Sequence, residues 1–235
     1  ASELSWSIYN FWYHASSFSF SPVNFLPIAY CLLLPIVLWF VIKPLILNTK
    51  ETSVYKAAYK RLLYNPDTFN HLLQQQKNAP SGYNNLGIEM GNPNAKINII
   101  IVCNPYCEAC SNAHPILDEI IRYNKNVKLK LIFTASNHKD DKRGIAARQV
   151  LAINAANNLN EIQQALNDWY LASEKNYDLF ATKYPMNGEL KLQEGEIARM
   201  EEWCALAEIT RTPTIFINRK RLPENYNVYD VKNIV

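Results

Sequence analysis

The pattern of apolar and polar positions separates an apolar N-terminal segment from a longer globular part. Residues 25–42 (FLPIAYCLLLPIVLWFVI) form an uncharged, strongly apolar run. As a helix this run spans about 27 Å, close to the thickness of about 30 Å of a bilayer core. It predicts a transmembrane helix over residues 25–48. A buried core helix and a cleavable signal sequence are the alternatives, but residues 1–24 lack the Lys or Arg with which a signal sequence begins.

The segments on either side of this run differ in character. Residues 1–24 are rich in Trp, Tyr and Phe interleaved with serines, which predicts a membrane-interface segment. Residues 49–86 are polar with apolar positions at helical spacing, and they predict a helical connecting arm with a helix restart at Asn65. Turn-forming residues then precede a globular domain over residues 87–235.

The globular part alternates between strand and helix patterns. The elements expected are strands at 96–103, 127–134 and 214–218, a helix over 111–123, a helical block over about 139–208, a short fourth strand after residue 220 and a final helix from residue 228. A strand, helix, strand unit is a parallel crossover, whereas two strands joined by a tight turn pair antiparallel. The order therefore predicts an α/β fold with a mixed central sheet and helices on both faces.

Charge changes this picture little. The formal net charge is +3, with 24 basic residues interleaved among 21 acidic ones, so the sequence shows no basic footprint for nucleic acid. The basic residues Lys139, Lys142 and Arg143 predict a solvated helix start, with a docking patch as the alternative.

Five cysteines are too few for a disulfide-scaffolded fold. Cys107 and Cys110 form a Cys-x-x-Cys unit. Cys31, Cys103 and Cys204 lie in apolar surroundings, where cysteine usually packs as a small hydrophobe, although a regulatory pairing of Cys103 with Cys204 is an alternative.

The Cys-x-x-Cys unit has the features that disulfide exchange needs. It lies between a strand and a helix, where free N–H groups favour the thiolate of the first cysteine. Cys107 is therefore the predicted nucleophile and Cys110 the resolving thiol. Glu108 places a carboxylate beside the pair, which opposes thiolate formation and predicts a less oxidising pair than the strongest periplasmic oxidants. His114 shares the helix face of the pair and is a candidate for tuning it, or simply a helix residue that precedes Pro115.

Two metal-binding interpretations of the cysteines remain as alternatives. Cys103, Cys107 and Cys110 also spell the Cys-x-x-x-Cys-x-x-Cys spacing of radical S-adenosylmethionine enzymes, but the chain has only six glycines and too few alternating strands after Cys110 for that barrel. A zinc site lacks a second ligand pair, so no metal is expected.

The unit NPYCEAC between a strand and a helix, the helical block, and the later Thr212-Pro213-Thr214 followed by IFI together resemble the thioredoxin superfamily, in its periplasmic disulfide-exchange branch with a helical insertion. The resemblance implies a thiol–disulfide oxidoreductase acting on proteins with cysteines. It also implies that Pro213 is cis and lies against the redox pair, and that the backbone of Thr212 pairs with bound substrate. A non-enzymatic adaptor with the same groove is the alternative function.

The predicted span, the arm, and the segments LGIEMGNPNAKINIIIVC and LPENYNVYDVK resemble the C-terminal part of bacterial vitamin K epoxide reductase fusions. The resemblance implies a membrane bundle of the same polypeptide as electron-transfer partner. A quinone is then expected only through that bundle, with no cofactor bound directly. It also implies a periplasmic domain on the inner membrane of a bacterium. The positive-inside tendency favours the cytoplasm instead, because the basic residues near the span all follow it: Lys43, Lys50, Lys56, Lys60 and Arg61.

Overall fold

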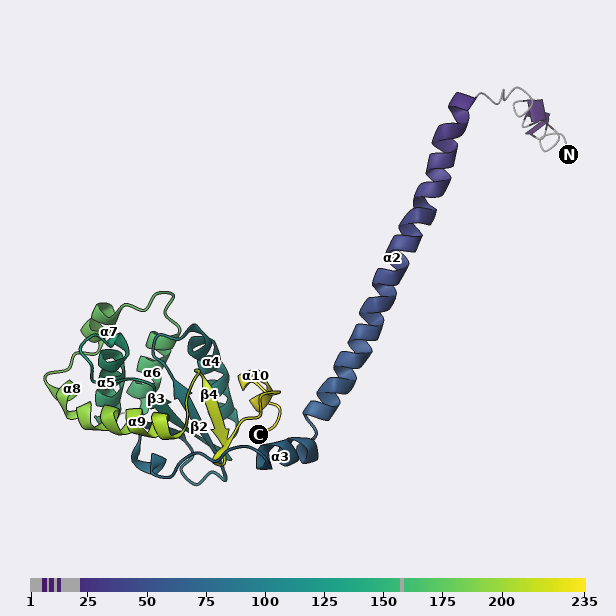
Figure 1. The fold of residues 1–235 in the computed structure, drawn as a ribbon. Coiled ribbons are helices and arrows are strands. Elements are labelled where there is room, and N and C mark those ends of the chain that lie inside the picture. The colour runs from purple at the N-terminus through teal and green to yellow at the C-terminus, as the bar shows by residue number, and fades with distance from the viewer. Residues whose placement is uncertain (1–5, 8, 11, 14–21, 157–158) are drawn as a thin grey trace. The chain divides into compact units, whose positions relative to one another are not determined.

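The computed structural model describes residues 6–7, 9–10, 12–13, 22–156 and 159–235 (Figure 1). The chain divides into two compact units, Ala1–Arg61 and Leu62–Val235, which are considered separately. The predicted interface segment, residues 1–24, lies mostly outside the described residues and stays a prediction.

The first unit consists mainly of helix α2, which runs from Pro22 to Leu63. Apolar side chains along its middle, including Trp39 and Phe40, are exposed within this chain. Within the described part of the chain, no helix combines the length and the apolar composition that crossing a membrane requires. The transmembrane helix predicted at residues 25–48 is therefore not confirmed.

The second unit is built on a five-stranded sheet in the order β1-β3-β2-β4-β5. Its strands are β1 (Ile88–Gly91), β2 (Ile97–Cys103), β3 (Val127–Phe133), β4 (Thr214–Ile217) and β5 (Lys220–Arg221). β2 and β3 are parallel, and the other neighbouring pairs are antiparallel. The predicted crossover, hairpin and mixed sheet are confirmed. Strand β1 was not predicted.

Helices flank this sheet on both faces, as predicted. They are α3 (Pro66–Gln74), α4 (Glu108–Tyr123), α5 (Lys142–Ala155), α6 (Leu159–Tyr170), α7 (Tyr177–Lys183), α8 (Glu189–Leu192), α9 (Glu194–Leu206) and α10 (Val228–Val231), with a 3-10 turn, η1, at Tyr83–Asn85. α5 to α9 form the predicted helical block, and α6 contacts both α4 and α5 (Figure 1).

Side chains along β2 point alternately to the two faces of the sheet, so successive residues contact different elements. Ile100 pairs with Phe216 of β4, whose ring lies 6.0 Å from that of Trp203 on α9. α9 therefore covers the face on which Ile100 points. Cys103 is three positions further along β2, so its side chain points to the opposite face, toward α4.

The compact unit also includes the segment between α2 and β1. Asn65 caps α3 by accepting hydrogen bonds from the N–H groups of Asp67 and Thr68 at 3.0 Å each, so the predicted helix restart is confirmed. Phe69 and Leu73 of α3 are buried in the domain core. This part of the predicted connecting arm thus contributes to the globular core.

Candidate functional site

A tight turn connects β2 to α4 and sets the position of Cys107. The side-chain oxygen of Asn104 accepts a hydrogen bond from the N–H of Tyr106 at 2.9 Å, and the Cys107 N–H donates to the Asn104 carbonyl at 3.0 Å. The indole N–H of Trp169, on α6, donates to the Pro105 carbonyl at 2.7 Å. Local turn chemistry and a contact from a distant helix therefore hold the same loop.

The two cysteines of the unit differ in exposure. Cys107 is the N-cap of α4 with extended backbone, and it is partly exposed. Its side chain makes no capping hydrogen bond, so the first N–H groups of the helix remain available to a negative charge on its sulfur. Cys110, one turn later, is only 1% exposed. A partner can reach Cys107, whereas Cys110 can react only from inside the protein.

A loop from the far end of the chain closes over Cys107. Its sulfur lies 3.4 Å from the carbonyl oxygen of Thr212 and is the donor of that contact. The bond between Thr212 and Pro213 is cis, the conformation that the resemblance implies. The Thr214 hydroxyl donates to the Arg211 carbonyl at 2.6 Å and fixes the loop just before β4. The structure thus brings together all four residues predicted for catalysis and substrate binding.

Cys103 is a third thiol at this site. It is 3% exposed at the end of β2, and it lies close enough to Cys110 for each thiol to affect the pKa of the other. Burial first, and then the contact with Cys110, raises the pKa of Cys103 well above its usual value. The interaction with Cys103 lowers the pKa of Cys110 to about 6, against the effect of burial. Of these two thiols, Cys110 is therefore the one whose ionisation is favoured.

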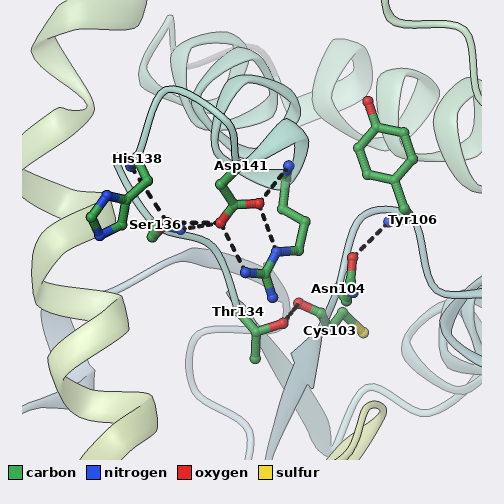
Figure 2. Close-up of polar contacts among 8 residues, drawn as sticks. Cys103, Asn104, Tyr106, Thr134, Ser136, His138 and Asp141 are labelled. Atoms are coloured by element: carbon green, nitrogen blue, oxygen red, sulfur yellow. Dashed lines mark hydrogen bonds and ion pairs between the residues drawn. The ribbon is translucent and has the colours of Figure 1, made fainter.

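The main chain around Cys103 is tied to the loop that follows β3. The N–H of Thr134 donates to the Cys103 carbonyl at 2.8 Å, and its hydroxyl does so at 3.4 Å. Figure 2 shows this contact beside a cluster in which Asp141 accepts hydrogen bonds from Ser136 and Arg143. Arg143 therefore takes part in an ion pair at the predicted start of α5, and the cluster fixes the loop between β3 and α5.

Glu108 and His114, the two candidate tuning residues, occupy different environments. Glu108 is exposed in the first turn of α4, next to Cys107. His114 is 9% exposed; its ring nitrogen lies 2.8 Å from the side-chain oxygen of Asn167, and its ring stacks on Tyr170. Burial lowers the pKa of His114, which favours the neutral ring. The two residues that contact the His114 ring, Asn167 and Tyr170, both belong to α6.

Two hollows open on either side of the first turns of α4. One, of about 440 Å³, is lined by Ala109, Asn112, Pro213, Ile215, Leu222 and Tyr229, among others. The other, of about 540 Å³, is lined by Tyr106, Glu108, Ser111, Pro115, Leu171 and Tyr229, among others. Pro213 lines the first hollow.

The metal and regulatory alternatives are not favoured. All five cysteines are free thiols. In the part of the chain that the structure describes, no three His, Cys, Asp or Glu residues are grouped to hold a metal ion, and the mixed sheet is not a radical-enzyme barrel. Cys204 lies on α9, beyond the face of the sheet opposite to that of Cys103, with its sulfur 3.9 Å from the Phe133 carbonyl. A pairing of Cys103 with Cys204 therefore lacks a geometric basis.

Sequence reasoning missed the contribution of α6. Trp169 holds the loop before Cys107, and Tyr170 lies buried beside Cys103. The only local signal is an aromatic pair at the end of an amphipathic helix, and such a pair is normally assigned to the core.

Comparisons with solved structures agree with the fold. ScsC from Proteus mirabilis in a transitional conformation is 15% identical, with 80% of this chain and 96% of that chain covered and a TM-score of 0.54. Oxidised BdbD from Bacillus subtilis is 13% identical, with 68% and 94% covered and a TM-score of 0.50. DsbA from Chlamydia trachomatis is 14% identical, with the same coverages and TM-score.

Family comparison extends this likeness to the sequence. A search of curated proteins gives no match. The family model described as thioredoxin matches residues 83–235, which is well over half of the chain and includes β1 to β5, the Cys-x-x-Cys unit and Pro213. The chain therefore belongs to the thioredoxin family.

Proposed function

We propose that this chain is a thiol–disulfide oxidoreductase that exchanges disulfides with protein substrates through Cys107 and Cys110. The observation that carries the proposal is the arrangement at the start of α4: an accessible sulfur, a buried sulfur one turn later, and the Thr212 carbonyl 3.4 Å from the first sulfur. The similar structures include DsbA from Chlamydia trachomatis, which is consistent with this class.

The reaction follows from the exposure of each group. The Cys107 thiolate attacks a substrate disulfide, forms a mixed disulfide and releases one substrate thiolate, which takes up a proton. The Cys110 thiolate then attacks the sulfur of Cys107, which forms the Cys107–Cys110 disulfide and releases the second substrate thiolate. The substrate gains two electrons and the protein loses two. Substrate oxidation is the same sequence in reverse.

Insulin reduction in the presence of dithiothreitol tests the proposal. The full chain should accelerate it, and Cys107→Ser should reduce the rate to the uncatalysed background. Cys204→Ala is the control, because it removes a thiol that is buried away from the pair, on the other side of the sheet, and should retain the rate. Equal background rates for the wild type and Cys107→Ser would reject turnover and favour a non-enzymatic adaptor.

We also propose that the domain works at a membrane, in the periplasm, with a bundle resembling vitamin K epoxide reductase as its electron partner. Support comes from the apolar run at residues 25–42 and from the sequence resemblance. Any quinone would bind to that bundle. A membrane-impermeant alkylating reagent applied to intact cells tests the location: labelling of Cys107 is expected, and protection until lysis would reverse the orientation.

A further inference from the structure

The larger of the two hollows beside α4 lies next to the nucleophile. Tyr106 and Glu108, the residues on either side of Cys107 in the sequence, both line this hollow of about 540 Å³. In the mixed disulfide the substrate cysteine is bonded to the Cys107 sulfur, so its neighbours in the substrate must lie on the surface around that sulfur. A side chain one or two positions from the substrate cysteine, about 3–7 Å along an extended chain, can therefore reach the hollow.

Two exposed apolar side chains from distant parts of the sequence line this hollow. Leu171, which directly follows α6, is 57% exposed, and Tyr229, on α10, is 60% exposed. Large apolar side chains are unfavourable in water, and a partner that covers them recovers that free energy. Exposed apolar side chains that gather at one hollow are therefore typical of a binding surface.

Both walls are fixed by hydrogen bonds within the chain itself. The Lys175 ammonium donates to the carbonyls of Tyr170 and Ala172 at 2.9 and 3.2 Å, and thereby holds the loop that carries Leu171. The helix α10, which carries the other wall, begins with a capping box. A surface that is already ordered loses less conformational entropy when a partner binds, so more of the contact free energy is available for selecting that partner.

Charge distinguishes the two hollows beside α4. The charged side chains that line the larger one are a single carboxylate, Glu108, and a single ammonium, Lys175, so their charges balance. The smaller hollow is lined by Arg211, Arg221 and Glu224, and is therefore more basic. Selection for an apolar side chain is consequently expected in the larger hollow, where Leu171 is exposed.

We propose that the larger hollow is a substrate subsite, in which Leu171 and Tyr229 contact an apolar or aromatic side chain next to the reactive cysteine of a protein substrate. Leu171 and Tyr229 are thus specificity-determining residues for the exchange. The inference rests on the proposed function and adds the substrate class to it. That class is extended segments in which an apolar residue adjoins a cysteine, and such segments are accessible chiefly in proteins that have not yet folded.

Symmetric, disulfide-linked dimers of a short peptide test this proposal. Two dimers are compared, which differ only in whether Phe or Ser adjoins the cysteine. The full chain is reduced with dithiothreitol and then separated from it. Cys107 attacks one sulfur of the dimer and releases one peptide thiol, and Cys110 then releases the second, so that the peptides gain the two electrons that the protein loses.

Acid quenching and mass spectrometry give the second-order rate constant for each dimer. Each rate constant is divided by that of the same dimer with free glutathione, which corrects for the reactivity of the peptide itself. We expect the wild type to react about ten-fold faster with the Phe dimer than with the Ser dimer, at the low end of the discrimination that an apolar pocket gives.

Variants assign this preference to the two walls. Leu171→Ser and Tyr229→Ser should each reduce the ratio of the two rate constants to about three or less. Leu206→Ser and Tyr123→Ser are matched controls, because they make the same substitutions at side chains that are 66% and 77% exposed and line neither hollow. Both controls should keep the ten-fold ratio.

Three results would overturn the inference. One is a wild type that reacts equally fast with both dimers, and another is a preference that survives in both Leu171→Ser and Tyr229→Ser. The third is a preference lost in Leu222→Ser but kept in Leu171→Ser, because Leu222 lines only the smaller hollow. A wild type that reduces neither dimer would instead reject the proposed function.

Discussion

Trp169→Phe tests whether α6 positions the redox loop. The substitution removes the N–H that donates to the Pro105 carbonyl at 2.7 Å, and the side chain is 2% exposed, so water cannot replace the donor. An unsatisfied buried carbonyl costs about 1–3 kcal/mol. A void of about 40 Å³ left by the smaller ring adds about 1 kcal/mol at roughly 24 cal/mol per Å³. We therefore expect the free energy of unfolding to fall by about 2–4 kcal/mol.

The chain offers a chemically matched control. Trp203 is 3% exposed and its N–H donates to the carbonyl of another proline, Pro80, at 3.2 Å, on the opposite side of the sheet. Trp203→Phe makes the same chemical change and should also lower stability, by a smaller amount because the Pro80 carbonyl is only partly buried and water can replace the donor. Only Trp169→Phe should also slow disulfide exchange, since only that indole contacts the loop leading to Cys107.

Urea unfolding followed by near-UV circular dichroism measures the free energy, and insulin reduction under conditions in which both variants are folded measures the exchange rate. Two outcomes would refute the reasoning. One is a Trp169→Phe variant that is destabilised but exchanges at the wild-type rate, and the other is equal slowing in both variants.

Two further predictions concern stability. Gly87→Ala should lower the free energy of unfolding by about 2–4 kcal/mol, because Gly87 has a φ of +67° and an added Cβ would lie 2.0 Å from the Leu131 carbonyl oxygen. Gly82→Ala also has a positive φ but meets open space, so it should lower the free energy of unfolding by only about 1 kcal/mol. Equal losses for the two variants in urea unfolding would contradict the steric argument. Although burial acts in the opposite direction, hydrogen bonds from Arg143 and Ser136 lower the pKa of Asp141 well below its usual range. The ionised Asp141 therefore stabilises the fold above its pKa in the unfolded chain, about 3.9, and this stabilisation is lost as pH falls below that value. Asp141→Asn should be about 2 kcal/mol less stable than wild type at pH 7, and the difference in free energy of unfolding should narrow below about pH 4. A difference that does not change with pH would argue against the ionic role.

Much of the fold was predictable because its signals are local. The apolar, β-branched run of β2 is too short for a buried helix, and the tight turn before β5 requires an antiparallel hairpin. Strand β1 was missed for a physical reason. It has four residues, includes the polar Glu89, and gains strand structure only by pairing antiparallel with β3, so its sequence alone gives little indication.

The sequence likewise predicts some residues of the site and misses others. Spacing identifies Cys107 and Cys110, and the sequence resemblance adds Thr212 and Pro213. Cys103 ends an apolar run, and its local sequence is that of a core residue. Only the alternation of β2 combined with the docking of α4 shows that Cys103 lies close to the redox pair.

The helical insertion should therefore be counted as part of the site. Three residues close together on α6 reach it: Asn167 contacts the His114 ring, Trp169 donates to the Pro105 carbonyl, and Tyr170 is buried near Cys103 and Cys110. The positions of these groups are coupled because one rigid helix carries them. A shift of α6 would move the loop before the nucleophile and the surroundings of the resolving thiol together. Changes in the insertion should consequently alter both steps of exchange, whereas a change at an exposed residue such as Glu108 acts next to the nucleophile alone.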